Sequence, residues 1–168
     1  FRASRRALGD ARPLRSSSMM RLRTLTVGAL LTLALPSLVT AQSSFVPDTV
    51  VTLRSIGSAL EFLPDRIALK TGTKVRVRYT NDGTLPHNLV FVKSEDDLDA
   101  LSAAAYQAGA EGYVPMQMKD KLIAWSVLLS AGKSADLDFV VPVPGEYPFI
   151  CLFPGHSGMM LGTLRALR

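Results

Sequence analysis

Short segments in which apolar and polar residues alternate make up most of the chain after residue 42, and they predict β-strands. Residues 74–79 alternate strictly, with valine and tyrosine on one face and basic side chains on the other. Further strands are predicted at 49–56, 87–92, 122–129, 136–141, 145–151 and 162–167. Asn81-Asp82-Gly83 is expected to form a turn, and Trp125 to fill the core. About seven or eight short strands indicate an all-β fold, either a β-sandwich or a Greek-key barrel.

One helix interrupts this strand pattern after residue 92. Ser94 is a favourable N-cap, and the acidic residues 95–97 suit the positive end of a helix dipole. Apolar residues then recur at helical spacing, and Gly109 and Gly112 are expected to end the helix. The pattern therefore predicts a strand-rich domain with a single helical insertion.

The amino-terminal segment reads as an export signal. Residues 19–41 have a short basic start, an apolar run of about 14 residues and small residues before a cleavage site after Ala41. A membrane-spanning helix needs about 20 apolar residues, so a retained anchor is the less favoured alternative. We expect residues 1–18 to be a misassigned upstream extension, with Met19 or Met20 as the true start. The secreted product would be one domain over residues 42–168, most simply in a bacterial periplasm.

Charge and cysteine content narrow the functions open to this domain. The 168-residue chain has a formal net charge of +5, with 48% hydrophobic and 20% charged residues. Seven of its 19 basic residues and one of its 14 acidic residues precede residue 42, which leaves the domain 12 basic and 13 acidic residues. This balance argues against a nucleic-acid binder that neutralises phosphates. The single cysteine excludes a disulfide within the chain.

The candidate chemistry is confined to two short segments. Cys151, His156 and Met160 follow one another in the spacing Cys-x4-His-x3-Met, and the only other histidine, His87, begins a predicted strand. A Pro-Gly pair between the cysteine and the histidine would turn the chain around one centre. Each residue alone has an ordinary structural explanation. Together they match the blue-copper ligand set, which is two imidazoles, a thiolate and a weak axial thioether.

These motifs resemble the signatures of the cupredoxins, the type 1 blue copper proteins. The segment from Cys151 to Gly162 is most similar to azurins and auracyanins, whereas Pro86-His87-Asn88 looks more like the plastocyanins. The resemblance covers most of residues 50–168. It implies a cupredoxin Greek-key β-sandwich that binds one copper ion and serves as a soluble electron carrier rather than an enzyme.

The resemblance also implies a role for each matching residue. His87, Cys151 and His156 would be the equatorial copper ligands, and Met160 would be the axial ligand, with Met159 as its competitor. In the family, the residue before the first histidine presents its carbonyl near the metal.

In this chain Pro86 stands directly before the first histidine, so its carbonyl is the one expected near the metal. Asn88 matches the asparagine that ties the two ligand loops together in the family. This chain has Leu152 where azurins carry a hydroxyl residue, so a side-chain partner for Asn88 is lost at that position. An apolar patch around the second histidine would receive redox partners, and its members here are Leu85, Phe153, Pro154, Gly155 and Met159.

The expected partners are redox proteins such as c-type cytochromes or membrane oxidoreductases, which would dock transiently on a monomeric carrier. The alternative is a periplasmic copper carrier or buffer with the same ligands, an open site and no electron-transfer role. Copper enzymes need a further histidine-rich centre, which two histidines cannot supply. A zinc site with the same ligands is also chemically possible, because zinc and copper both bind imidazole and thiolate. The pair Met116 and Met118 is expected to pack the core or a loop rather than bind Cu(I).

Overall fold

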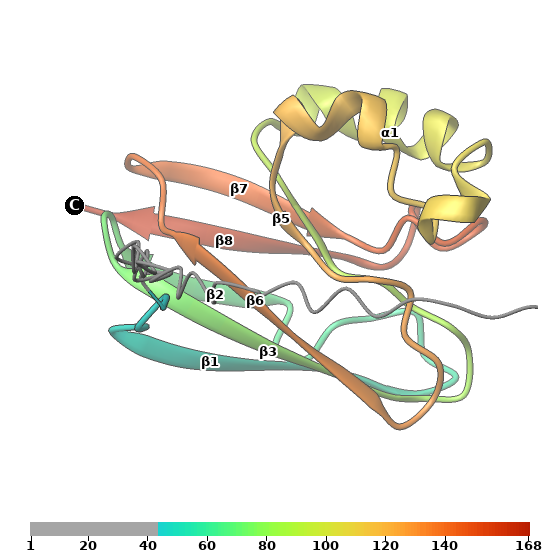
Figure 1. Ribbon diagram of the computed structural model, residues 1–168, viewed down its shortest axis with the longest axis horizontal. Helices are drawn as coiled ribbons and strands as arrows, with labels where there is room; N and C mark the ends of the chain where they lie inside the picture. The colour runs from blue at the N-terminus through green and yellow to red at the C-terminus, as the bar shows by residue number, and fades with distance from the viewer. Residues whose placement is uncertain (1–43) are drawn as a thin grey trace, which may run out of the picture. The chain divides into compact units, whose positions relative to one another are not determined.

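The computed structural model describes residues 44–168; the predicted extension (1–18) and signal peptide (19–41) lie outside the described residues. Within residues 44–168, eight strands form two facing layers, and one helical insertion interrupts them. Figure 1 shows this arrangement. The strands are β1 (Thr49–Gly57), β2 (Arg66–Lys70), β3 (Lys74–Gly83), β4 (Val90–Val92), β5 (Leu122–Trp125), β6 (Lys133–Val140), β7 (Gly145–Ile150) and β8 (Leu161–Leu167). The predicted all-β sandwich with one helical insertion is therefore confirmed.

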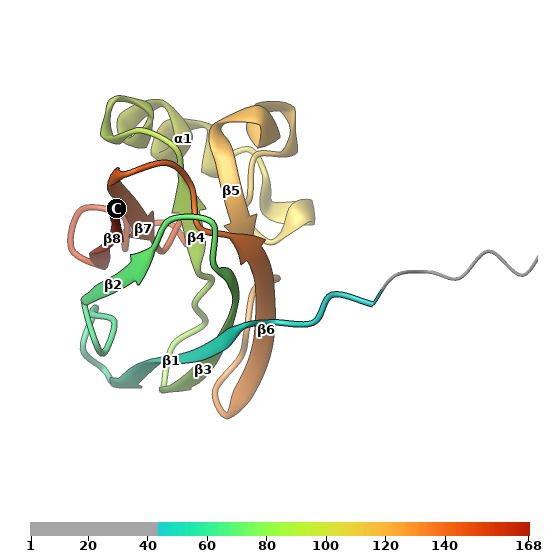
Figure 2. The ribbon, with the colours of Figure 1, turned by 90° about the vertical axis from the view of Figure 1, so that its left-hand side faces the viewer.

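The two layers are a three-stranded sheet in the order β1-β3-β6 and a five-stranded sheet in the order β2-β8-β7-β4-β5 (Figure 2). Strand β1 runs parallel to β3, and β2 runs parallel to β8, whereas the remaining pairs are antiparallel. The prediction from sequence lacked β2. Ile67 is its only fully buried residue, so the strand, which lies at a sheet edge, carries almost no alternating apolar signal.

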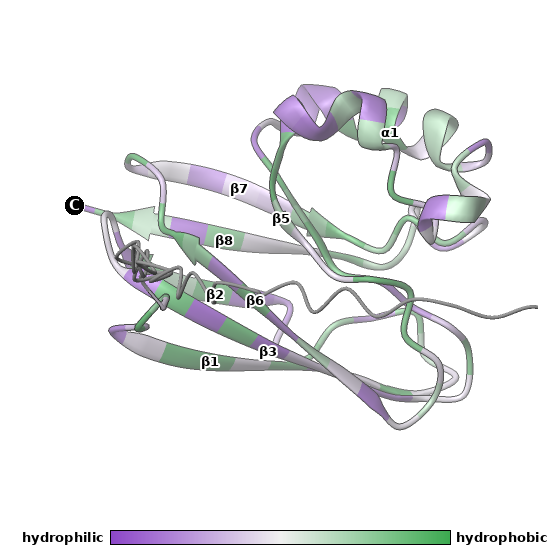
Figure 3. Ribbon diagram, in the orientation of Figure 1, coloured by the Kyte–Doolittle hydropathy of each residue, from purple (hydrophilic) through white to green (hydrophobic). Residues whose placement is uncertain are grey.

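Alternation in β3 and β6 creates one apolar and one charged face (Figure 3). The inward side chains of β3 are fully buried, and they include Val75, Val77 and Tyr79, as the pattern predicts. On the outer face Arg76 donates two hydrogen bonds to Asp138, at 2.7 and 2.6 Å. A second arginine–aspartate pair repeats this arrangement two residues along, so the solvent-facing side of the sheet is held by cross-strand ion pairs.

The predicted turn at residues 81–83 is wrong, because β3 continues to Gly83 and the chain turns only afterwards. Asn81 occupies an inward position of the strand, and its side chain is fully buried. The backbone of this stretch pairs with β1, where Asn81 lies opposite Ser55 and Gly83 opposite Gly57. Strand pairing and a buried amide have overridden the local turn preference of the sequence.

Residues 94–121, which we call the flap, connect β4 to β5. They contain η1 (Glu95–Asp97), α1 (Leu98–Ala105), η2 (Gly109–Glu111) and η3 (Met116–Lys121). The side chain of Ser94 accepts a hydrogen bond from the N–H of Asp96 at 3.2 Å, as expected for an N-cap. The α-helix is shorter than predicted, because after Ala105 the backbone tightens into i→i+3 hydrogen bonds before Gly109 is reached.

The flap covers part of the outer face of the five-stranded sheet (Figure 1). Leu101, Ala105 and Val114 pack there against Val90 and Val92 of β4. Strand β4 is therefore buried on both faces, which explains its uninterrupted apolar sequence.

The prediction that Trp125 fills the core is wrong, since 38% of it is exposed at the end of the edge strand β5. Among the described strands, β5 pairs only with β4, so Trp125 has a neighbouring strand on one side only. Within residues 44–168, no helix has the length and apolar character needed to cross a bilayer.

Candidate metal centre

Three side chains of the kinds that bind metals converge at one end of the sandwich. The Sγ atom of Cys151 lies 3.7 Å from Nδ1 of His87 and 3.7 Å from Nδ1 of His156. The two Nδ1 atoms are 3.2 Å apart. One ligand atom from each residue lies within 4.8 Å of the others, and all three side chains are buried. The sequence separates these residues by up to 69 positions, and the fold brings them to a single point.

His87 is held by the backbone on both sides. Its N–H donates to the carbonyl of Leu129 at 3.0 Å, and the N–H of Leu129 donates back to the carbonyl of His87 at 2.8 Å. The ring also packs closely on Gly83, where an added Cβ would lie 3.4 Å from Nε2. The imidazole orientation is therefore fixed by main-chain groups.

The segment between β7 and β8, residues 151–160, is the ligand loop. It closes on itself, because the N–H of Cys151 donates to the carbonyl of Met160 at 3.1 Å and that of Met160 donates to His156 at 2.9 Å. Gly155 has a φ of +84°, a conformation that glycine adopts without strain. The predicted Pro-Gly turn thus curls the loop so that the thiol and the imidazole face the same point.

The two neighbouring methionines have opposite environments. Met160 is fully buried in the same apolar cluster as Cys151, whereas Met159 is 64% exposed. Only a side chain that points inward can serve as an axial ligand, so the burial favours Met160 over its competitor Met159.

Asn88 connects the ligand loop to both the first histidine segment and the flap. Its Oδ1 accepts a hydrogen bond from the N–H of Leu152 at 2.7 Å, and its Nδ2 donates to the carbonyl of Gly112 at 2.9 Å. The hydroxyl expected after the cysteine is absent, and the main-chain N–H of Leu152 provides the contact. The connection between the ligand segments therefore does not depend on the side chain at position 152.

Asn81 is a site residue that the sequence reasoning missed. Its Nδ2 donates to the carbonyls of Leu85 and Leu129, both at 2.8 Å. Leu85 lies two residues before His87, and Leu129 belongs to the segment that pairs with His87, so one amide joins the two segments. Its Oδ1 accepts hydrogen bonds from Ser55 Oγ at 2.9 Å and from the N–H of Gly83 at 2.9 Å. The available signal was its position, because a polar residue stands where the alternation of β3 calls for an apolar one.

Burial disfavours charge on all three converging groups. It raises the pKa of the Cys151 thiol to about 11. Burial, and secondarily the proximity of His156, lowers the pKa of His87 to about 4, and burial also lowers the pKa of His156. Without a cation the three groups are therefore neutral near pH 7. A bound metal ion would offset the charge of a thiolate here, and one soft sulfur with two imidazoles is a donor set that fits copper.

Aromatic and apolar side chains surround the second histidine. The ring of Phe153 lies 4.8 Å from that of His156 and 5.1 Å from that of Tyr113, which belongs to the flap. His156 itself is 6% exposed. The five predicted docking residues are half-buried or exposed; Leu85 precedes the first histidine, and Phe153, Pro154, Gly155 and Met159 belong to the ligand loop.

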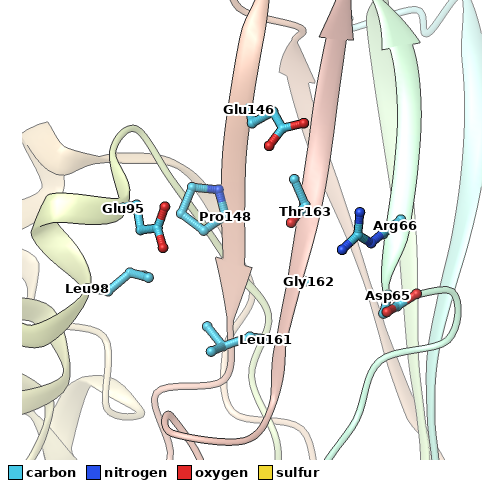
Figure 4. Close-up of a pocket in the computed structure, with 9 residues that line it drawn as sticks. All are labelled: Asp65, Arg66, Glu95, Leu98, Glu146, Pro148, Leu161, Gly162 and Thr163. Atoms are coloured by element: carbon cyan, nitrogen blue, oxygen red, sulfur yellow. The ribbon is translucent and has the colours of Figure 1, made fainter.

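A separate hollow of about 300 Å³ lies on the outer face of the five-stranded sheet (Figure 4). It is lined by charged residues of both signs and by a few apolar ones, which are Asp65, Arg66, Glu95, Leu98, Glu146, Pro148, Leu161, Gly162 and Thr163. None of these residues belongs to the converging cluster. Met116 and Met118 pack against the apolar cluster that the flap forms with β4, as expected for packing residues rather than Cu(I) ligands.

Fold and site together define a copper-binding sandwich, and comparison with known proteins agrees. Residues 49–166 match the family described as copper binding proteins, plastocyanin/azurin family. The match covers more than half of the chain, so the protein belongs to the plastocyanin/azurin family of copper-binding proteins, the cupredoxins. The predicted family and its copper cofactor are thereby confirmed.

Auracyanins and azurins are among the similar proteins. Auracyanin-B of Chloroflexus aurantiacus is 37% identical over 123 residues, which are 70% of this chain and 52% of that protein. The chain thus spans about half the length of this relative. Azurin of Pseudomonas putida is 34% identical over 96 residues, which are 52% of this chain and 74% of that protein.

Solved structures of auracyanins have the same fold. The structure of auracyanin B gives a TM-score of 0.69 at 34% identity, covering 73% of this chain and 91% of that one. Dithionite-reduced auracyanin from Roseiflexus castenholzii gives a TM-score of 0.67 at 28% identity, covering 73% of this chain and 100% of that one.

Proposed function

We propose that this protein is an extracytoplasmic electron carrier that binds one type 1 copper ion and passes single electrons between redox proteins. His87, Cys151 and His156 would be the equatorial ligands and Met160 the axial ligand. The observation that carries the proposal is the convergence of one thiol and two imidazole Nδ1 atoms at a buried point. Copper bound there would supply a one-electron couple, Cu(II)/Cu(I).

The chain's own contribution is a rigid cage. Main-chain hydrogen bonds hold both histidine segments, and Asn88 and Asn81 join those segments to their neighbours. Such a cage keeps the ligands in nearly the same positions in both oxidation states, so little rearrangement accompanies electron transfer. His156 packs against Phe153 and is only 6% exposed, so little of its surface meets water on the side where a partner would dock.

Export and partners belong to the same proposal. The pattern of residues 19–41 supports secretion with cleavage after Ala41, and a periplasmic location follows from it. A c-type cytochrome or a membrane oxidoreductase would dock transiently on the apolar patch, as suits the small interfaces of redox proteins. No catalytic role is included in the proposal.

A visible absorption spectrum with one equivalent of Cu(II) tests the proposal. We expect an intense blue band that bleaches with ascorbate and returns on oxidation. Cys151→Ser should abolish the band, since the thiolate is its source, whereas Met160→Leu should keep the colour and raise the reduction potential in voltammetry. A colourless protein that still holds copper would favour the copper carrier or buffer. A blue band that persists in Cys151→Ser would refute the ligand assignment.

A further inference from the structure

We propose that Met159 is a site of reversible oxidation, at which a hydroperoxide converts the thioether to a sulfoxide and thereby weakens docking at the apolar patch. The inference rests on the proposed electron-carrier function and adds a means of regulating it. Three observations carry it, namely the accessibility of this sulfur, its position beside His156, and the uncharged sequence around it.

Met159 offers the most accessible sulfur in the described part of the chain. Its side chain is 64% exposed, whereas Met160 and Cys151 are fully buried. Met116 and Met118 are half-buried against the apolar contacts of the flap. Because oxidation of sulfur follows exposure, a peroxide in solution reaches Met159 first and leaves the copper ligands covered.

The position of Met159 makes its polarity matter. Its N–H donates to the carbonyl of His156 at 3.0 Å, so the side chain projects from the loop that carries this histidine. The two segments around the site, residues 83–92 and 151–164, contain no aspartate, glutamate, lysine or arginine. A partner that docks here gains affinity from apolar burial rather than from charge pairs. A sulfoxide oxygen in this surface would have to lose its water without gaining a partner, which opposes docking.

The oxidation step is balanced without help from the metal. A sulfur lone pair attacks one peroxide oxygen, the S–O bond forms and the O–O bond breaks. The sulfur loses two electrons to the departing oxygen, which leaves as hydroxide or, from an organic hydroperoxide, as alkoxide. This leaving group takes up the proton that the new sulfur-bound hydroxyl loses, so the products are the sulfoxide and water or an alcohol. A thiol-dependent methionine sulfoxide reductase returns two electrons and removes the oxygen, so the modification is reversible.

The test compares electron self-exchange of the copper-loaded protein before and after treatment with hydrogen peroxide. The cupric form is treated, the peroxide is removed, and peptide mass mapping locates the added oxygen. Exchange between oxidised and reduced copies is then measured by NMR line broadening. We expect the first oxygen on Met159, an unchanged blue band, and a rate about tenfold lower, which a sulfoxide reductase restores.

Two variants distinguish the effect of a polar group at position 159 from the effect of oxidation at other residues. Met159→Gln carries a permanent polar group of similar length and should exchange slowly even without peroxide. Met159→Leu stays apolar and lacks the thioether, so its own rate should be the same before and after treatment. First oxidation at another sulfur, or a sulfoxide at Met159 with an undiminished rate, would overturn the inference. Untreated protein that is colourless, or blue without self-exchange, would instead refute the proposed carrier function.

Discussion

A single buried amide, that of Asn81, makes four hydrogen bonds around the first histidine segment. The carbonyls of Leu85 and Leu129 that it joins flank His87 on two different stretches of chain. The side chain is fully buried, so these bonds are shielded from bulk water. Asn81 is therefore a positioning residue, which acts on the candidate copper site through the backbone rather than through direct contact.

Replacing Asn81 by leucine should destabilise the fold strongly. The change keeps the volume and removes four buried hydrogen bonds, to Leu85, Leu129, Gly83 and Ser55, although Leu129 keeps the N–H of His87 and Ser55 keeps the hydroxyl of Tyr79. We expect a loss of at least about 2 kcal/mol in the free energy of unfolding. Urea unfolding of the metal-free protein measures it. The matched control is Thr80→Val, which removes only an exposed hydrogen bond to Ser134 and should cost far less. Equal losses in the two variants would contradict this role.

Most of the candidate ligands could be predicted from the sequence, whereas the hydrogen bonds that hold them in place could not. Spacing alone identifies Cys151, His156 and Met160, since the three lie in one short loop. Neither the pairing of His87 with Leu129 nor the contact between Asn88 and the flap is visible in the sequence, because each joins segments far apart in the chain. Asn81 was read as part of a turn for the same reason. Local preference is a weak guide where tertiary hydrogen bonds decide the conformation.

At the scale of elements, the flap is fastened to the candidate site as well as to the sheet. The carbonyl of Gly112 receives the amide of Asn88, and Tyr113 places its ring against Phe153. Both Gly112 and Tyr113 have a φ of 66°, and for a tyrosine this left-handed conformation is unfavourable. The contacts of the two residues offset that cost, so the sharp bend between η2 and η3, within the flap, is tied to the ligand segments.

Gly112→Ala should therefore destabilise the protein more than Gly132→Ala. Both glycines have a positive φ, and each substitution should cost about 1 kcal/mol for that reason. At Gly112 the new Cβ would also lie 3.2 Å from the N atom of Leu128, whereas nothing lies within 4 Å of it at Gly132. Urea unfolding of both variants measures the difference. Identical stabilities would mean that the bend is not tightly packed.

The cross-strand pair of β3 and β6 gives a stability that depends on pH. A hydrogen bond from Arg76 lowers the pKa of Asp138, so the contribution of the pair is present above the ordinary pKa of an aspartate. It is lost as the pH falls through the lowered pKa. Asp138→Asn should therefore be less stable than the native protein at about pH 7, and this deficit should be smaller at about pH 2.5, below the ordinary pKa of an aspartate.

Urea midpoints at the two pH values test this dependence. Asp120→Asn is the control, since its carboxylate takes part in no ion pair within residues 44–168. A deficit of Asp138→Asn that is the same at both pH values would show that the ion pair contributes nothing.

At the scale of the whole molecule, the two segments that carry the candidate site, residues 83–92 and 151–164, contain no aspartate, glutamate, lysine or arginine. The arginine–aspartate pairs lie on the outer face of the three-stranded sheet, and the acidic start of the flap lies on the other layer. The predicted domain has 12 basic and 13 acidic residues, so its net charge is also small. Electrostatic steering should therefore contribute little to encounters at the apolar patch.

Electron self-exchange of the copper-loaded protein should change less than about twofold when the salt concentration is raised from low to physiological values. Leu85→Lys adds a cation to the patch, so two copies should repel each other, and the rate should fall at low salt and recover as salt is added. Leu85→Gln is the uncharged control and should show no such recovery. A strong salt dependence in the native protein would contradict an uncharged docking surface.

The ligand loop leaves the sandwich and returns to it between two adjacent antiparallel strands. Ile150 and Leu161, the residues that flank this loop, pair with each other. The two ends of the loop are therefore fixed one strand spacing apart, roughly 4.8 Å. A segment of another length or sequence could span the same two anchor points and leave the register of β7 and β8 unchanged. Exchanging the ten residues of the loop would therefore change three of the four candidate ligand positions, while His87 and the two sheets would stay as they are.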